Sequence, residues 1–270
     1  MQDYILATKF YNESKRLPTL IADIAAQTHR PRKLVFIDDG SIDNSGETAI
    51  LEARKWNLDC ELVSMPKKKR GNLDTLGRAW NKAQPLLKKL ASDTKYFATT
   101  DVDSEFPQDY FETMTAFLEA NPSVGVVGGQ LEGSYLRTFP MFTGKTFRAA
   151  IIMSIDKYWD ISIDSFVNIK ALKLGYELRI LDAVKVKSPP SHLQSGKGRF
   201  RAGRLAYYGG IQPLYAISKG IARRDASYLR GYWSEFSRAS WKCNDRDILA
   251  YYQSEMKRKI LRYARRLLRA

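Results

Sequence analysis

Several common signatures are missing from this 270-residue chain, and each absence removes a class of protein. No G-x-G-x-x-G motif follows the first predicted strand and no Walker lysine motif occurs, so the dinucleotide and P-loop fingerprints are both absent. No window approaches the ~18 uncharged apolar residues of a membrane-spanning helix. The first six residues, MQDYIL, have no basic region and too short an apolar run for a signal peptide.

Cysteine and histidine are also scarce. The two cysteines, Cys60 and Cys243, are far apart and match no metal or redox spacing, which favours a reduced, cytoplasmic setting. The two histidines are His29, in a predicted turn, and His192, which follows a Pro-Pro pair. The sequence therefore contains no zinc spacing.

What the chain has in excess is positive charge, and it is unevenly placed. Residues 191–270 hold 18 Lys or Arg against 5 Asp or Glu, a net charge of +13, whereas residues 1–190 have a net charge of only +2. We predict a near-neutral domain over 1–190 and a basic, helical extension over 191–270. An extension of this charge suggests an anionic partner: a membrane surface, a nucleic acid or a phosphorylated acceptor.

Apolar runs of strand length alternate with segments of helical periodicity through the first 190 residues. This alternation predicts stacked βαβ units and a mainly parallel α/β sheet flanked by helices. Beyond residue 130 the pattern is less regular, and residues 144–148 (GKTFR) look like a turn into a short helix. The predicted strands cover residues 3–9, 33–37, 60–65, 96–101, 124–129 and 176–186.

The stretch 96–105 (YFATTDVDSE) ends a predicted buried strand with two carboxylates one residue apart. Alternation along an extended chain points Asp101 and Asp103 the same way, and two oxygen ligands on one side suit a divalent cation. The spacing is weak by itself, since roughly one chance D-x-D is expected in a chain of this length. A second one, at 245–247, lies in a polar helical stretch and is interpreted as solvated surface. Only its position after a strand favours the first.

Polar clusters follow three predicted strands: Asn12 and Glu13, Asp38 and Asp39, and Asp101 and Asp103. Because the carboxyl ends of parallel strands line one crevice, we expect these clusters to converge. Helix capping is an alternative for single acids, Asp43 in particular. The three clusters together suit a nucleotide, with carboxylates for base and ribose donors and a metal for the diphosphate.

With these positions in view, the chain resembles the family 2 glycosyltransferases of the GT-A fold over roughly residues 3–190. The resemblance implies a nucleotide-sugar donor, UDP- or GDP-linked, a Mg²⁺ or Mn²⁺ ion, and transfer with inversion at the anomeric carbon. It rests on residues 8–14 (TKFYNES), 36–43 (FIDDGSID), 71–81 with GRAWN at 77–81, 100–103 (TDVD), 143–148 (TGKTFR) and 164–176 (DSFVNIKALKLGY).

Carried over position by position, the resemblance implies a role for each matching residue. Asp38 would hydrogen-bond the base or ribose, and Asp101 would lie near the ribose and the metal. Asp103 would ligate the metal. The remaining donor contacts would come from Thr8, Phe10, Glu13, Arg70 and Arg148, with Arg70 facing the phosphates from a basic loop.

The catalytic base and a further metal ligand come from less regular segments. Counted back from the Gly-Tyr pair at 175–176, the family's catalytic aspartate falls on Asp164, although Ile163 stands where the family usually has glutamate. Asp160 is a nearby alternative, and Asp164 could instead cap a helix. The base would deprotonate the acceptor hydroxyl. His192 could complete the metal shell, or it could be structural.

Three functions are compatible with these observations. The first is a metal-dependent glycosyltransferase acting on a glycan or lipid-linked acceptor at the inner membrane face, with its basic C-terminal helix lying in the headgroup layer. The second is a nucleic-acid-binding protein, for which no RNP, zinc or helix-turn-helix signature is found. The third is a nucleotidyltransferase, for which a glycine-rich triphosphate loop is missing. The first agrees with the most residues.

Overall fold

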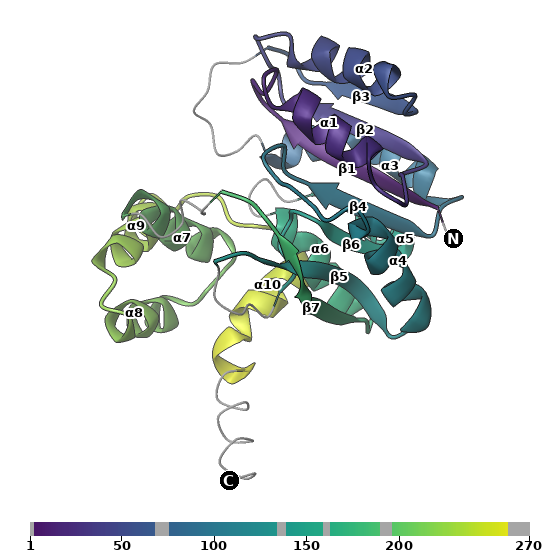
Figure 1. Cartoon of the computed structure of the whole chain (residues 1–270). Helices are drawn as coiled ribbons and strands as arrows, with labels where there is room; N and C mark the ends of the chain where they lie inside the picture. Colours follow the sequence, from purple (N-terminus) through teal and green to yellow (C-terminus); the bar gives the residue numbers. More distant parts are fainter. Residues whose placement is uncertain (1–2, 68–75, 134–138, 159–162, 190–195, 259–270) are drawn as a thin grey trace. The chain divides into compact units, whose positions relative to one another are not determined.

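The computed structural model describes residues 3–67, 76–133, 139–158, 163–189 and 196–258 (Figure 1). Contacts within the chain divide it into two compact units, Met1–Pro189 and Pro190–Ala270. They are called the N-terminal and C-terminal units below. None of the helices described is both long enough and apolar enough to cross a bilayer.

The N-terminal unit is built on a sheet whose seven described strands lie in the order β3-β2-β1-β4-β6-β5-β7. Strands β1 to β4 pair in parallel, as do β5 and β7, whereas β6 runs antiparallel to both of its neighbours. The predicted α/β class with a mainly parallel sheet is therefore confirmed. The strands are β1 (Tyr4–Phe10), β2 (Lys33–Asp38), β3 (Cys60–Ser64), β4 (Tyr96–Thr100), β5 (Val124–Leu131), β6 (Lys145–Arg148) and β7 (Glu177–Val186).

Helices connect the strands and cover the sheet (Figure 1). Helix α1 shows why these helices form. Its apolar residues recur at helical spacing and are buried on one face: Leu17, Leu20, Ile21 and Ile24. Ser14 lies before the helix and donates its backbone N–H to Asp43. The helices of this unit are α1 (Leu17–Ala25), α2 (Ser45–Lys55), α3 (Leu76–Ala91), α4 (Tyr110–Ala120), α5 (Ala149–Met153) and α6 (Ile163–Lys173).

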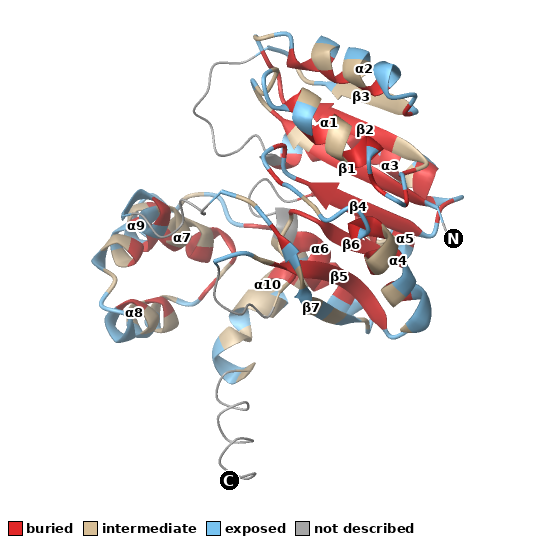
Figure 2. Ribbon diagram, viewed as in Figure 1, coloured by how far each residue is buried: buried red, intermediate tan, exposed pale blue. Residues whose placement is uncertain are grey.

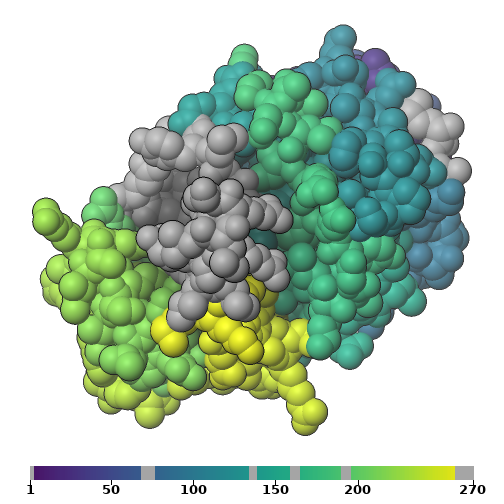
Figure 3. Space-filling model, turned by 90° about the horizontal axis from the view of Figure 1, so that it is seen from below, coloured from purple at the N-terminus to yellow at the C-terminus, as the bar shows by residue number. Residues whose placement is uncertain are grey.

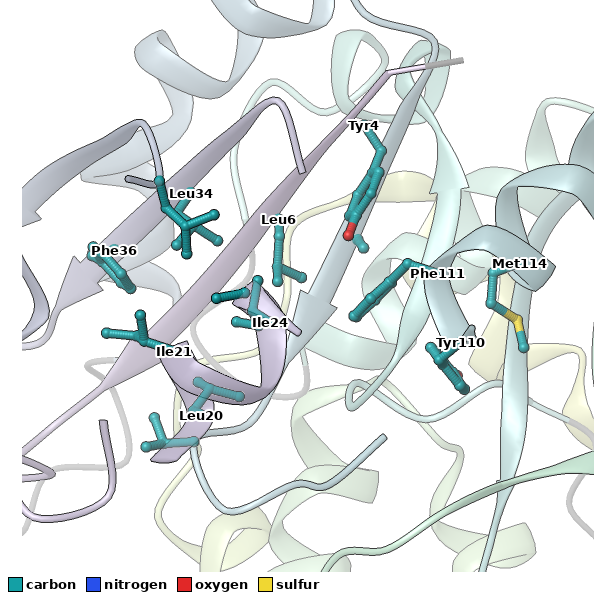
Figure 4. Close-up of a cluster of buried hydrophobic side chains, with 14 of the residues drawn as sticks. Tyr4, Leu6, Leu20, Ile21, Ile24, Leu34, Phe36, Tyr110, Phe111 and Met114 are labelled. Atoms are coloured by element: carbon teal, nitrogen blue, oxygen red, sulfur yellow. The ribbon is translucent and has the colours of Figure 1, made fainter. Parts of the chain in front are cut away.

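The core lies between the sheet and the helices on its faces, where the central strands are buried along nearly their whole length (Figure 2). Figure 4 shows one layer, in which Leu6 and Phe36 of the sheet meet Ile21 and Ile24 of α1. Near them, the rings of Tyr4 and Phe111 stack with centroids 5.3 Å apart. This enclosed layer holds the strand ends in fixed register.

Residues 144–148 correct one expectation. They were predicted to be a turn into a short helix, but Lys145–Arg148 is the strand β6 and the helix α5 begins only at Ala149. The strand is stabilised by pairing on both sides, with Phe147 opposite Phe97 of β4 and Val126 of β5. A strand of four residues is too short to show a clear periodicity in the sequence. The strands that stabilise it lie far away in the sequence.

The C-terminal unit is helical in the part that is described, with α7 (Gly196–Tyr208), α8 (Pro213–Ala222), α9 (Ala226–Ser237) and α10 (Arg246–Gln253). Helices α7 and α9 approach so closely that a Cβ on Gly203 would lie 1.9 Å from the carbonyl oxygen of Tyr228. The second D-x-D is a helix cap as well as a surface element, since Asp245 accepts the N–H groups of Asp247 and Ile248.

A partly buried ion pair joins the same two helices. Glu235 of α9 accepts from the Arg204 guanidinium and from the Tyr208 hydroxyl of α7. Burial raises the pKa of Glu235, but hydrogen bonds from Ser240, Tyr208 and Arg204 outweigh it and hold the pKa below its ordinary value. The guanidinium of Arg204 therefore stabilises the packing of α7 against α9 within this unit.

Candidate active site

Strands β1, β2 and β4 end at the same edge of the sheet. Phe10 is paired with Asp38, and Thr8 is paired with Thr100, so Asp38 and the residues that follow Thr100 lie at the ends of the two strands that flank β1. The D-x-D begins at the first residue after β4. The three polar clusters expected to converge are thus on adjacent strands, at the edge where parallel sheets bind ligands.

Asp38 lies at the end of β2, almost enclosed, with 8% of its surface exposed. Its Oδ1 accepts the backbone N–H of Ser41 at 2.8 Å, which closes the turn that follows the strand. A Cβ on Gly46 would lie 3.1 Å from the other oxygen, so the start of α2 packs directly against this carboxylate. Next to it, Asp39 forms an ion pair with Lys9 at 3.2 Å.

The loops after β1 and β2 are tied together by hydrogen bonds. Asn12, at φ 56°, accepts the Ile42 N–H with its side-chain oxygen and donates its own N–H to Ser41. The Glu13 N–H donates to the Ser45 hydroxyl at 2.7 Å. These hydrogen bonds fix the loop after β1 to the loop after β2, and so hold this part of the sheet edge in place.

Asp43 completes this link between the loops. It accepts from Ser14 and from the Ser45 backbone, each at 3.2 Å. Burial raises the pKa of Asp43, but hydrogen bonds from Ser45 and Ser14 outweigh it and lower the pKa below its ordinary value. These contacts favour a structural role at the start of α2, the alternative left open for this residue, although the N-cap position itself is Asn44.

Asp101 and Asp103 are exposed, and the residues between and after them, Val102 and Ser104, are buried. A threonine from the segment before β6 organises the turn. The Thr143 hydroxyl accepts the Asp101 N–H at 3.0 Å, donates to Asp101 Oδ2 at 3.0 Å, and lies 2.6 Å from the Ser104 hydroxyl. The first carboxylate of the D-x-D is therefore oriented by a residue 42 positions later in the chain.

The two exposed carboxylates fit a divalent cation that takes its other ligands from a diphosphate. Among the residues the structure describes, no group of three His, Cys, Asp or Glu side chains converges on a possible metal position. The metal site predicted at Asp101 and Asp103 therefore stays a prediction, in which these two carboxylates would be the protein ligands from the described residues. His192, the third predicted ligand, lies outside the described residues.

The other predicted donor contacts fall in different places. Thr8 is buried and donates its hydroxyl to the Thr100 carbonyl, and Phe10 is buried against Phe36. Both are framework residues whose side chains are enclosed. The Glu13 carboxylate is partly exposed and pairs with Arg16 at 3.2 Å. Arg70 lies outside the described residues.

Arg148 is at the opposite end of the sheet. It pairs in register with Tyr96, the first residue of β4, whereas the D-x-D follows the last. Its guanidinium donates to the carbonyls of Val124, Leu118 and Asn121, at 2.8, 2.7 and 3.1 Å. It therefore fastens α4 to β5, and this placement removes Arg148 from the candidate donor site.

Asp164 is in the first turn of α6, and Asp160 lies outside the described residues. The segment leading to α6 is held by α3. Asn81 donates to the Tyr158 carbonyl at 3.0 Å and accepts the Tyr158 N–H, while Gln84 donates to the Ile155 carbonyl at 2.7 Å. The GRAWN motif thus supplies an amide that fixes the backbone shortly before the candidate base.

Sequence reasoning overlooked Thr143, Ser41 and Ser45 as organisers of the edge. Only one signal was available, because Thr143 opens the TGKTFR motif that carried part of the resemblance. The serines are ordinary turn residues in sequence, and their role depends on a second loop that only the fold brings near.

A sequence profile of glycosyl transferase family 2 matches residues 6–152. The chain belongs to this family. The matched segment contains the three clusters, the D-x-D and the TGKTFR motif. The predicted family and the predicted class of enzyme are therefore confirmed.

Solved structures of the same fold are similar to this chain at low sequence identity. The mannosyltransferase PcManGT from Pyrobaculum calidifontis has 18% identity and a TM-score of 0.58, covering 100% of this chain and 83% of its own. A S. aureus TarS chain has 16% identity and a TM-score of 0.56, covering 86% and 73%. Glucosyl-3-phosphoglycerate synthase from Mycobacterium tuberculosis has 14% identity and a TM-score of 0.53, covering 76% and 77%.

These matches confirm the GT-A fold. The match spans only 41% of a longer TarS chain, and no curated protein sequence matches this chain.

Proposed function

We propose that this chain is a metal-dependent, inverting glycosyltransferase that moves a sugar from a nucleoside-diphosphate donor to an acceptor hydroxyl. The observation that carries the proposal is the register of β1, β2 and β4, which brings Asp38 and the exposed Asp101 and Asp103 to the ends of the two strands that flank β1. Family membership favours this function over nucleotidyl transfer and over nucleic-acid binding.

The structural neighbours support the donor class. PcManGT was solved with GDP-Man and Mn²⁺, TarS with UDP-GlcNAc, and the M. tuberculosis synthase with Mn²⁺ and UDP. We propose a UDP- or GDP-linked sugar for this chain, with Asp38 at the base or ribose end. Arg70 remains a proposed phosphate contact.

Asp101 and Asp103 would hold a Mg²⁺ or Mn²⁺ ion, with His192 as a further proposed ligand. Such an ion would neutralise the negative charge of the departing diphosphate. The Thr143 hydroxyl donates to the Asp101 carboxylate, which would orient this carboxylate for the ion before the donor binds.

The proposed reaction is a single in-line displacement. The acceptor oxygen forms a bond to the anomeric carbon as the bond from that carbon to the diphosphate oxygen breaks, which inverts the configuration. Asp164 accepts the proton of the attacking hydroxyl. The nucleoside diphosphate leaves with the electron pair of the broken bond.

For the acceptor we propose a glycan, lipid-linked or part of the cell envelope, met at the inner face of a membrane. The charge of residues 191–270 supports this, because a net of +13 favours an anionic lipid surface. The final basic segment, 259–270, lies outside the described residues. Its removal should weaken binding to anionic vesicles, and unchanged binding would remove it from this contact.

The metal role is tested by Asp103→Ala, with Asp93→Ala as the matched control. Asp93 is also an exposed aspartate, but it precedes β4 instead of following it. Asp103→Ala should abolish Mn²⁺-dependent donor hydrolysis or transfer and leave the circular dichroism spectrum unchanged, whereas Asp93→Ala should remain active. Equal turnover by both variants would reject the metal site.

The base is tested by Asp164→Asn. This variant should bind a nucleotide sugar with Mn²⁺ in calorimetry as the wild type does, and should lose transfer to the acceptor. Transfer at the wild-type rate would move the base to another residue, Asp160 being the nearest alternative.

A further inference from the structure

Helix α8 carries its charged side chain on the inner face and its large apolar side chains on the outer face, the reverse of a normal surface helix. Its ten residues, PLYAISKGIA, include one charged side chain, Lys219. That ammonium group is turned toward the rest of the unit, where it pairs with Glu255 at 3.2 Å and is only 16% exposed. Ala216 and Gly220 are buried, and a Cβ on Gly220 would lie 2.4 Å from Leu229 of α9. The inner face of α8 is thus small and charged.

The outer face is aliphatic. Leu214 is 78% exposed and Ile221 is 66% exposed, the two highest values for large hydrophobic side chains in the described chain. They are seven residues apart, so they lie on one side of the helix, and the partly exposed Ile217 lies between them. A helix facing only water normally carries polar residues at these positions. We define Leu214, Ile217 and Ile221 as the α8 stripe.

Positive charge surrounds the end of the stripe. Arg223 and Arg224 follow α8 directly and both are exposed. Two acidic residues next to α8 have partners inside the unit: Asp225 caps α9, and Glu255 pairs with Lys219. Figure 3 shows the surface of this unit in light green and yellow. An exposed aliphatic stripe beside two exposed arginines is the pattern of a surface that enters the headgroup layer of an anionic membrane.

We propose that the α8 stripe and Arg223–Arg224 together form a membrane-docking surface for anionic lipid, which the C-terminal unit uses in addition to its final segment. This rests on the membrane contact in the proposed function and identifies the side chains that make it. A nucleic acid fits less well, because aliphatic side chains gain nothing from a phosphate backbone, whereas they gain burial in the acyl boundary.

The experiment measures cosedimentation of the full chain with vesicles of phosphatidylcholine containing roughly a quarter phosphatidylglycerol. The double variant Leu214→Gln with Ile221→Gln should reduce binding about tenfold, because two aliphatic side chains no longer enter the acyl boundary. The variant Arg223→Gln with Arg224→Gln should also reduce binding about tenfold on these vesicles and should have no effect on pure phosphatidylcholine. The matched control is Leu51→Gln, since Leu51 is an exposed helical leucine of the N-terminal unit, and binding should stay at the wild-type level.

Each outcome decides a different point. If both double variants bind the vesicles at the wild-type level, the docking surface is overturned and the proposed function stays intact. A wild-type chain that does not bind anionic vesicles would overturn the membrane contact as a whole, while donor turnover would still test the glycosyltransferase. If the Leu214 and Ile221 variant changes oligomeric state in sedimentation velocity without changing vesicle binding, the stripe covers a second copy of the chain, and the inference fails.

Discussion

Replacing Thr143 by valine tests whether this residue organises the D-x-D. Its hydroxyl has one proton and two lone pairs, and the structure uses all three. The proton goes to Asp101 Oδ2, so the buried Ser104 hydroxyl and the Asp101 N–H are the two donors to Thr143. Valine has nearly the same shape as threonine but can neither donate nor accept these hydrogen bonds.

The expected cost follows from the groups left without a partner. Two donors, the Ser104 hydroxyl and the Asp101 N–H, lose their acceptor, and each costs about 1–3 kcal/mol where water cannot replace it. Because Asp101 is exposed, part of its loss is recovered by solvent, and we expect Thr143→Val to lower the free energy of unfolding by about 2–3 kcal/mol. Loss of the Thr143 hydrogen bond to the Asp101 carboxylate should also weaken Mn²⁺ binding in the presence of UDP or GDP by about tenfold or more.

Thr146→Val is the matched control. Thr146 is also a buried β6-region threonine, but its hydroxyl has no hydrogen-bond partner among the described residues. The same substitution there should leave stability unchanged or raise it, and should leave Mn²⁺ affinity unchanged. Urea unfolding and calorimetry measure both quantities. Equal losses in the two variants, or none in Thr143→Val, would refute the assignment.

Three further predictions concern other parts of the framework. Asn81→Ala should lower the rate of transfer while donor affinity stays unchanged, since Asn81 holds the backbone before α6; equal losses in kcat and in donor binding, measured by steady-state kinetics and calorimetry, would indicate general unfolding. Glu235→Gln should destabilise the C-terminal unit by about 2–3 kcal/mol at neutral pH. Because the folded pKa of Glu235 is lowered, this difference should be full above about pH 4.3 and should shrink as the pH falls through the folded pKa; a pH-independent difference in urea unfolding would contradict it. Gly144→Ala should lower the free energy of unfolding by about 2–4 kcal/mol, because its Cβ would lie 2.4 Å from the Tyr110 hydroxyl, whereas Gly175→Ala, also at positive φ but in open space, should cost only about 1 kcal/mol.

The amino-acid sequence by itself determined the strand and helix alternation of the N-terminal unit and the position of the acidic clusters. These are local properties: a buried strand reads as an apolar run, and a carboxylate at its end marks where the run stops. Parallel pairing then requires Asp38 and Asp101 to share an edge, and the register confirms that they do.

Only the tertiary structure decided what depends on distant partners. Strand β6 exists because two strands flank it, and that insertion carries Arg148 to the edge opposite the D-x-D and brings Thr143 beside Asp101. The α8 stripe also depends on a distant partner, because Lys219 turns inward to form an ion pair with Glu255. In each case a pairing energy between remote segments overrides the local preference, and no window of sequence contains both partners.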